Sequence, residues 1–383
     1  MIQLRPHQQE AMDNWISAGT IGTIKSPTAS GKSHVALKAI EINPDSIYII
    51  VHTTALQDQW AAHIKNLDIE YGLLGNGNND ITKPVTIAIV NSARDIKIKC
   101  RLMIFDEVHH ALSHENYKVI QNATFSSFMG LSASPEKDLD HIIWNEYIQR
   151  FPIVFDYPLE DAIDDGVVSP FEEEGIPCKL TAEEQILYDK YTATVKKVMP
   201  MYGDFRIALM AARRGAGEAA CSMLSAIQQR KMLLAKSQGK TLKALEMIES
   251  DTMPKCIVFS ESVDTVDWLY NNIKHKEKFV YHSKTKKKER AKTLDLFRAS
   301  PNGVLLSAKA LDEGLDVPSC SAAIVISGTS SKRQYVQRIG RILRPQEGKL
   351  AKLYELFIEG SVDEKWYKKR HSKKRVKIDI SQR

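Results

Sequence analysis

A loop of small and polar residues, Ser26–Ser33, carries the first chemistry that the sequence suggests. It reads Ser-Pro-Thr-Ala-Ser-Gly-Lys-Ser and lies between the short β-branched pair Thr23-Ile24 and a helical pattern. Strand, loop and helix in this order are the context of a phosphate-binding loop, in which backbone N–H groups and the positive end of the helix hold phosphate. Lys32 is expected to reach the β- and γ-phosphates of ATP, and the Ser33 hydroxyl to ligate Mg²⁺. The predicted nucleotide contacts are Thr28, Ser30, Gly31, Lys32 and Ser33, although Ser26 stands where the usual motif has glycine.

Two adjacent carboxylates, Asp106 and Glu107, end a second apolar run that begins at Arg101. Acids at the carboxyl edge of a parallel sheet point into the crevice in which phosphates bind. Asp106 is expected to hold Mg²⁺, and Glu107 to orient and deprotonate the attacking water. Phosphoryl transfer needs positioning and charge neutralisation, and the two acids together with the loop supply both. Without that loop, the acid pair would indicate only a solvated strand end.

The elements that must position these residues are two series of short β-branched runs, which alternate with helical patterns. The first series is 23–24, 46–51, 85–90, 101–106 and 128–132, and the second is 255–260, 278–282, 303–308, 322–327 and 353–358. Uninterrupted apolar strands separated by helices indicate parallel sheets that are covered on both faces. We therefore expect an α/β protein with two such domains, residues 1–155 and 241–365.

The segment 156–240 differs from both series and is predicted to be a linker followed by a helical insertion. Thr181 and Glu184 have the spacing of a capping box, and apolar residues follow at helical spacing from Leu187 to Met199. A second helical stretch is expected from about residue 218 to residue 237. The insertion is basic, so it is either a solvated helical face or a prong that contacts nucleic acid. The basic tail, residues 366–383, leaves the same two alternatives open.

Composition bounds the remaining possibilities. The net charge of +6 over 383 residues favours a polyanionic partner, although only weakly. Uncharged apolar runs stay shorter than about 18 residues, and the N-terminus lacks the apolar run of a secretory signal. We therefore expect no membrane span and a location in the cytoplasm, the nucleoid included. The five cysteines lie far apart without a CxxC pair, which argues against a cysteine-based zinc site.

The sequence as a whole resembles the superfamily 2 helicases and translocases. Asp106-Glu-Val-His109 resembles their DEAH-type box. Leu4-Arg-Pro-His-Gln8 resembles the glutamine motif of the branch that includes nucleotide-excision-repair translocases and phage branch-migration helicases, and the resemblance implies that Gln8 reads adenine. Val51–Trp60 resembles motif Ia, with His52 in place of the usual proline, and residues 90–92 lie where motif Ib is expected. Ser132-Ala-Ser134 resembles the Ser-Ala-Thr motif III, with Ser134 in place of threonine, and the resemblance implies that Ser132 and Ser134 couple the nucleotide to the nucleic acid.

The second half of the chain continues the resemblance. Residues 258–260 resemble motif IV, residues 311–318 motif V and residues 337–345 motif VI. The family implies two RecA-like domains with ATP in the cleft between them, so a monomer already has a complete site. Arg341 and Arg344 would reach the γ-phosphate as arginine fingers, with Gln337 at the γ-phosphate or the attacking water. Gly314 and Asp316 of motif V are further predicted nucleotide contacts, which resemble residues that couple ATP to nucleic acid.

The nucleic acid is expected to lie across one edge of both domains, where mostly hydroxyl and amide side chains suit phosphate contacts without sequence readout. The predicted contacts are Thr53, Gln59, Asn91, Ser92, Arg94, Ser260 and Ser307. Trp60 is either a base-stacking residue or part of the core. The Arg-Pro-x-Gln start and the basic insertion favour an ATP-dependent DNA helicase or translocase that acts on single-stranded or branched DNA. An RNA helicase, a nucleotide-gated clamp and the motor subunit of a restriction or defence complex are the alternatives.

Overall fold

The computed structural model of the chain describes residues 2–135, 141–213, 217–282, 285, 287–308, 320–327 and 350–371. The chain divides into two compact units: in the part described, unit 1 ends at Pro170 and unit 2 begins at Phe171. A helix with the length and the apolar character that a membrane span requires is absent from the residues described.

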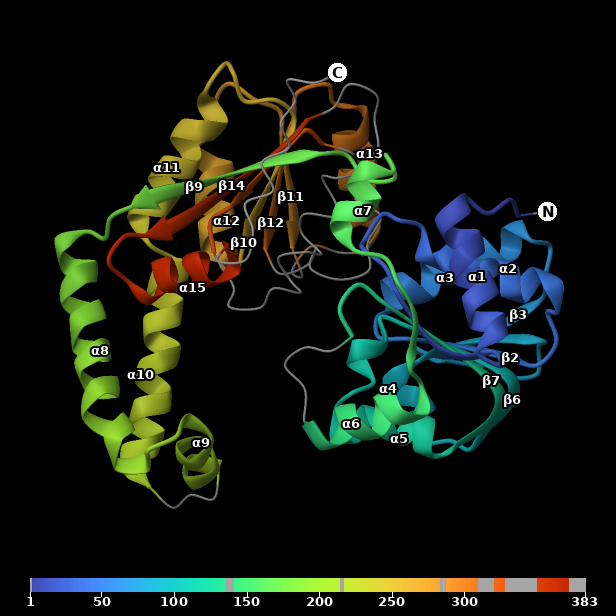
Figure 1. Cartoon of the computed structure of the whole chain (residues 1–383). Coiled ribbons are helices and arrows are strands. Elements are labelled where there is room, and N and C mark those ends of the chain that lie inside the picture. Colours follow the sequence, from blue (N-terminus) through green and yellow to red (C-terminus); the bar gives the residue numbers. More distant parts are fainter. Residues whose placement is uncertain are drawn as a thin grey trace. The chain divides into compact units, whose positions relative to one another are not determined.

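Unit 1 is built on an eight-stranded sheet with the order β4-β3-β5-β2-β6-β7-β1-β8. Figure 1 labels β2, β3, β6 and β7 of this sheet. The strands are β1 (Ile21–Lys25), β2 (Ile47–Val51), β3 (Tyr71–Gly75), β4 (Asn78–Asn79), β5 (Val85–Ile89), β6 (Ile98–Asp106), β7 (Ala123–Ser132) and β8 (Ile153–Asp156). The helices are α1 (Pro6–Ser17), α2 (Lys32–Ile42), α3 (Thr54–Asn66), α4 (Val90–Ala93), η1 (Val108–His110, a 3₁₀ turn), α5 (His114–Gln121), α6 (His141–Arg150) and α7 (Leu159–Asp164). All neighbouring strands are parallel except β3 and β4.

The apolar runs explain why the central strands of unit 1 form where they do. The last five residues of β6, Leu102 to Asp106, are all buried, which is the pattern of a strand covered on both faces. Met103 and Phe105 pack with Phe128 and Tyr147 in one core. All five runs of the first series are strands in parallel register, so the predicted α/β class is confirmed for this unit.

Unit 2 contains a six-stranded parallel sheet with the order β11-β12-β10-β13-β14-β9. The strands are β9 (Phe171–Cys178), β10 (Cys256–Ser260), β11 (Lys278–His282), β12 (Val304–Ala308), β13 (Ala322–Val325) and β14 (Ala351–Ile358). The helices are α8 (Ala182–Tyr202), α9 (Phe205–Arg213), α10 (Glu218–Ala235), α11 (Gln238–Glu249), α12 (Val263–Asn272), α13 (Lys287–Ala299) and α15 (Val362–His371). The second series of apolar runs corresponds to β10 to β14, again as predicted.

Strand β9 is the element of unit 2 that the sequence pattern does not predict. It pairs in parallel with β14 over its whole length, from Phe171 beside Ala351 to Cys178 beside Ile358. Three glutamates, a glycine and Pro177 interrupt its apolar pattern. Such residues are tolerated at a sheet edge, where one side of the strand makes no ladder hydrogen bonds. Part of the segment expected to be a linker and insertion therefore belongs to the second sheet, whereas the other domain bounds stay predictions.

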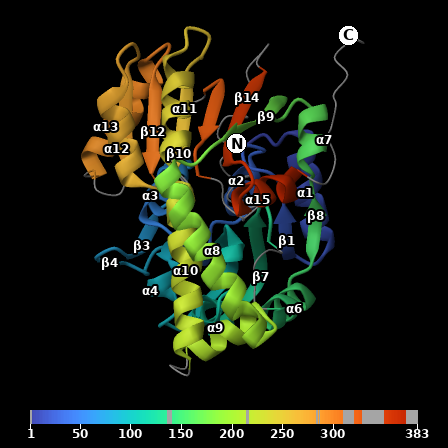
Figure 2. The ribbon, with the colours of Figure 1, turned by 90° about the vertical axis from the view of Figure 1, so that its left-hand side faces the viewer.

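Helices α8, α9 and α10 form a projection from unit 2, which we call the prong (Figures 1 and 2). Helix α8 begins as predicted: Thr181 is its N-cap and forms the capping box with Glu184. The long helices α8 and α10 lie side by side, and α9 covers their far end. Val198, Ala208 and Met223, one from each helix, form a small core of their own. The prong starts after β9 and ends before α11, so both of its roots lie in unit 2.

Candidate active site

Three neighbouring strands of unit 1 bring the candidate catalytic residues to one edge of the sheet. The order β6-β7-β1 places the acid pair after β6, Ser132 at the end of β7 and the phosphate-binding loop after β1. The Ser26 backbone N–H donates to the Ser132 carbonyl oxygen at 3.1 Å, which joins the loop to β7. Residues that are separated by about 100 positions in the sequence therefore meet at one site.

The loop itself turns through residues with positive φ. Gly31, which precedes α2, has φ 82°, and Ala29 has φ 72°. A Cβ on Gly31 would lie 2.4 Å from Gln8 Nε2, so only glycine fits there without a shift of Gln8. Ser26, which replaces the usual first glycine, forms a hydrogen bond with the Ser30 hydroxyl, and Ser30 Oγ donates to the Pro27 carbonyl at 2.7 Å. Ser26 therefore stabilises the loop through hydrogen bonds within the loop itself.

Lys32, Asp106 and Glu107 form a compact charged group at this edge. Lys32 Nζ lies 3.1 Å from Glu107 Oε1, and both side chains are largely buried. Glu107 has φ 50°, a strained value for a residue with a side chain. Its backbone N–H donates to Asp106 Oδ1 at 3.0 Å. The sequence prediction that these three residues lie together agrees with this geometry, whereas their catalytic roles stay predictions.

Burial and charge act differently on the two acids. Burial and the neighbouring Glu107 carboxylate raise the pKa of Asp106. Burial also opposes the charge of Glu107, but the nearby Lys32 and His109 outweigh it and lower the pKa of Glu107 to about 2. Opposite shifts in adjacent carboxylates are typical of catalytic sites, because each acid is adapted to a different task.

Ser132 and three histidines connect the acid pair to its surroundings. His109 Nδ1 lies 3.0 Å from Ser132 Oγ and 3.4 Å from Glu107 Oε2. The Ser134 backbone N–H donates to Ser132 Oγ at 3.2 Å, so both serines of motif III belong to one network with His109. His52 stacks on His110 with ring centroids 3.8 Å apart. The coupling role of motif III stays a prediction.

Gln8 is buried, but it contacts the loop backbone. Its Nε2 donates to the carbonyl oxygens of Ser30 and Gly31 at 3.1 and 3.3 Å, and its Oε1 accepts from the Arg5 N–H at 3.0 Å. Contact with adenine would require Gln8 to exchange these bonds, so this role stays a prediction. His7, which the sequence pattern does not single out, also holds the loop, with Nε2 2.9 Å from the Ser30 carbonyl oxygen.

The loop has features that fit a bound phosphate group. Thr28 Oγ1 is buried and lacks a hydrogen-bond partner among the residues described, although buried hydroxyls are ordinarily paired. Ser33 lies in the first turn of α2, where backbone N–H groups are left unsatisfied by the helix. Phosphate oxygens accept hydrogen bonds from both kinds of donor. The carboxylate of Asp106 and the hydroxyl of Ser33 are oxygen ligands of the kind that Mg²⁺ prefers.

The predicted nucleic-acid contacts divide into two groups by their exposure. In unit 1, Thr53 and Gln59 follow β2, and Asn91, Ser92 and Arg94 follow the adjacent β5; all five are exposed or half-buried. The Thr53 hydroxyl accepts from the Leu56 N–H at 3.3 Å and so caps α3. In unit 2, Ser260 and Ser307 are each 1% exposed, so their side chains do not face solvent. Gly314, Asp316, Gln337, Arg341 and Arg344 lie outside the residues that the structure describes.

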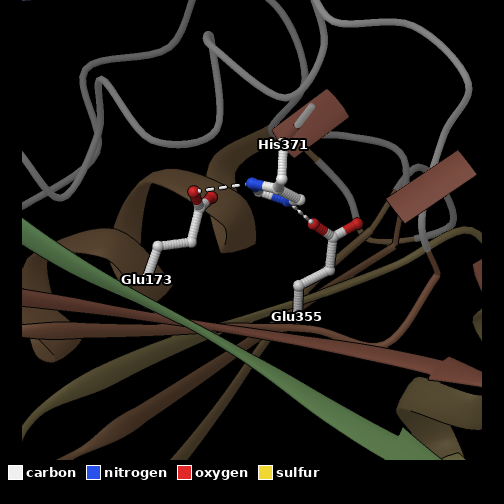
Figure 3. A group of neighbouring side chains, drawn as sticks. All are labelled: Glu173, Glu355 and His371. Carbon is white, nitrogen blue, oxygen red and sulfur yellow. Dashed lines mark hydrogen bonds and ion pairs between the residues drawn. The ribbon is translucent and has the colours of Figure 1, made fainter. Parts of the chain in front are cut away.

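A second polar cluster lies in unit 2, where His371 at the end of α15 stands between Glu173 of β9 and Glu355 of β14 (Figure 3). His371 Nδ1 is 2.9 Å from Glu173, and Nε2 is 3.2 Å from Glu355. Arg370 also pairs with Glu355. The two glutamates contact the two different ring nitrogens of His371, so neither nitrogen is left to bind a metal ion. A metal cation at this place would also be repelled by the positive charge of Arg370. The cluster is therefore an ion-pair clasp that holds α15 on the sheet.

Two family models match the chain. Residues 1–137 match Type III restriction enzyme, res subunit, and residues 239–346 match Helicase conserved C-terminal domain.

Individual relatives extend the match over almost the whole chain. DNA 3′-5′ translocase XPB2 of Sulfurisphaera tokodaii is 32% identical over 377 residues, which cover 94% of this chain and 83% of that protein. DNA 3′-5′ helicase XPB of Mycobacterium tuberculosis is 24% identical, and the match covers 94% of this chain and 62% of that protein. Among solved structures, S. cerevisiae Dbp5 bound to RNA and ADP BeF3 matches with a TM-score of 0.60 at 14% identity, covering 96% of this chain and 86% of that one. At that identity, the likeness supports the fold alone.

Proposed function

The chain belongs to the XPB-type branch of the superfamily 2 helicases and translocases, and on this premise we propose that it couples ATP hydrolysis in unit 1 to 3′-5′ movement on DNA. The class of motor and the tandem RecA-like α/β fold, which the sequence predicts, agree with this family. The direction of movement is that named for the relatives.

The observation that carries the proposal is the ion pair between Lys32 and Glu107, 3.1 Å apart beside Asp106. A phosphate that enters the loop offers Lys32 a new partner, and Lys32 then leaves Glu107. Glu107 loses the charge that lowers its pKa most, so its carboxylate becomes a stronger base toward water. In this scheme ATP itself prepares the base that hydrolyses it.

Asp106 and Ser33 are the residues that would hold Mg²⁺. The bound ion would neutralise charge on the β- and γ-phosphates. Lys32 contacts one carboxylate oxygen of Glu107, and His109 contacts the other, Oε2. Ser132 in turn contacts the ring of His109, so these two residues help to keep Glu107 in place. Arg341, Arg344 and Gln337 would complete the site in the manner that the family resemblance implies.

DNA would contact unit 1 along the carboxyl ends of β2 and β5, through Thr53, Gln59, Asn91, Ser92 and Arg94. These side chains suit phosphate groups, so binding would depend little on sequence and would weaken with salt. We further propose that the active form is a monomer that works in the cytoplasm, and that its substrates are the single-stranded or branched DNA of repair and recombination.

ATP hydrolysis is to be measured with single-stranded DNA, duplex DNA and RNA at low and moderate salt, with Glu107→Gln as the control. Loss of a general base lowers turnover by about 10²–10⁴-fold, whereas nucleotide binding should persist in this variant. Stimulation by DNA but not RNA, lost in the control, is the expected result. Partial duplexes with a 3′ or a 5′ single-stranded tail then test the direction of movement. Only the 3′-tailed substrate should be unwound, or have a bound protein displaced from it.

The other outcomes each contradict a different part of the proposal. Equal stimulation by RNA would favour the RNA helicase. Nucleotide-dependent DNA binding without turnover would indicate the clamp. Unwinding of the 5′-tailed substrate alone would refute the direction but leave the motor.

A further inference from the structure

We propose that Trp60 is a positioning residue of the ATP site, whose indole N–H fixes the orientation of the Asp106 carboxylate. The proposal rests on the function above, because it gives Trp60 a part in the same reaction. Neither a base-stacking residue nor a merely packed core residue, the two alternatives that the sequence leaves open, describes what Trp60 does in the structure.

The contact is direct and enclosed. Trp60 Nε1 donates to Asp106 Oδ2 at 2.9 Å, and the two residues are 1% and 4% exposed. The other oxygen, Oδ1, accepts from the Glu107 backbone N–H at 3.0 Å. Each carboxylate oxygen thus receives one donor, and together the two donors define the plane in which the carboxylate lies. A base cannot stack on a tryptophan that is buried to this extent.

The chemistry of the donor explains why tryptophan suits this position. An indole N–H donates and never accepts, so it favours the ionised carboxylate that a cation requires. A hydrogen bond to an ionised acceptor is about twice as strong as one between neutral groups. Groups that orient a metal ligand in this way commonly change metal affinity or activity by about 10–100-fold when they are replaced.

The helix that carries Trp60 also links Asp106 to the predicted DNA-binding edge. Trp60 lies in α3, the helix that Thr53 caps, and Thr53 is a predicted DNA contact. The His52–His110 stack provides another contact between the start of this helix and the turn after the acid pair. Helix α3 therefore joins the predicted DNA-binding edge of unit 1 to Asp106 by two sets of contacts.

The test separates the indole N–H from the volume of the ring. One variant is Trp60→Phe, and a second carries β-(3-benzothienyl)alanine in place of Trp60, which keeps the bicyclic shape but has sulfur where tryptophan has N–H. The matched control is Trp15→Phe, since buried Trp15 also donates its indole N–H, at 2.8 Å, but to the Phe128 backbone carbonyl. Binding of a fluorescent ATP analogue is measured against Mg²⁺ concentration, and steady-state hydrolysis with DNA is measured in parallel.

Both position-60 variants should need about 10–100-fold more Mg²⁺ for half-maximal nucleotide binding, with little change in the affinity measured without Mg²⁺. The Trp15→Phe control should follow the wild-type Mg²⁺ curve. A wild-type curve for the benzothienyl variant would overturn the proposal even if Trp60→Phe is poorly folded. Equal shifts in the position-60 and position-15 variants would also overturn it, because they would indicate general loosening. Hydrolysis without DNA stimulation in the wild type would refute the motor function alone, since the Mg²⁺ comparison reads binding.

Discussion

The buried ion pair between Lys240 of α11 and Asp363 of α15 gives the sharpest prediction for the stability of unit 2. Their side chains are 1% and 2% exposed, and Lys240 Nζ lies 2.8 Å from Asp363 Oδ2. The same oxygen accepts from the Ile358 N–H at 3.1 Å. Lys240→Met keeps an unbranched side chain that is one atom shorter, but it removes the ammonium group and leaves the Asp363 carboxylate buried with too few donors. Removal of one partner from such a pair costs about 3–5 kcal/mol.

At about 1.4 kcal/mol per tenfold change, this cost corresponds to roughly two to three and a half orders of magnitude in the opening equilibrium of α11 and α15. Amide hydrogen exchange of peptides from these helices measures that equilibrium locally. The double variant Lys240→Met with Asp363→Leu should recover much of the loss, because no unpaired charge remains. Lys243→Met is the control, since Lys243 pairs with Glu246 on the exposed face of α11 and contributes no more than about 1 kcal/mol. A loss below about 1 kcal/mol in Lys240→Met, or a double variant as unstable as the single one, would refute the reasoning.

Three further predictions concern the loop, the clasp and the prong. Gly31→Ala should lower ATP affinity about tenfold or more, because alanine must hold φ 82° and its Cβ would lie 2.4 Å from Gln8 Nε2. Gly77→Ala, at φ 83° but in open space, is the control for a fluorescent-nucleotide titration, and equal losses would contradict the steric argument. For His371, the bonds to two glutamates outweigh burial and raise the pKa to about 9, so its stabilisation is complete below about pH 6.5 and is lost as pH rises through about 9. The unfolding midpoints of wild type and His371→Gln should therefore differ at pH 6 and converge by pH 10, and a constant difference would oppose this account. Thr181→Ala should cost about 1 kcal/mol and speed amide exchange in the first turn of α8, and unchanged exchange would show that the capping box is dispensable.

The fold was predictable where the signal is local and continuous. The short apolar run that ends at Asp106 favours a strand covered on both faces, and the capping box at Thr181 marks the start of a helix without tertiary information. Strand β9 gives no such signal, because an edge strand is stabilised by the backbone of β14 and tolerates glutamate, glycine and proline. Its place in the sheet depends on a partner at the other end of the unit.

In the candidate site, too, the residue types could be predicted from local sequence, whereas the contacts with distant residues could not. The residue types of the loop and the acid pair identify phosphate chemistry, since the chemistry itself demands glycine, lysine and carboxylate at those spacings. The contacts that orient these residues come from far along the chain: Trp60 is 46 positions from Asp106, and Gln8 is 22 from Ser30. Such pairings depend on how α3 and α1 pack on the sheet, which periodicity does not encode.

The pairing of β9 with β14 has a consequence for the synthesis of the protein. The strands that the structure describes in unit 1 are complete by residue 156, whereas β9 ends at residue 178 and its partner β14 only at residue 358. At about 5–20 residues per second, β9 waits on the order of 10–40 s on the ribosome with its backbone hydrogen-bonding groups unpaired. Nascent chains that stop before residue 350 would carry a folded unit 1 and an open strand. The three glutamates of β9 would then repel other strands on both sides during this interval, and in the finished sheet they would still protect the side that β14 does not cover.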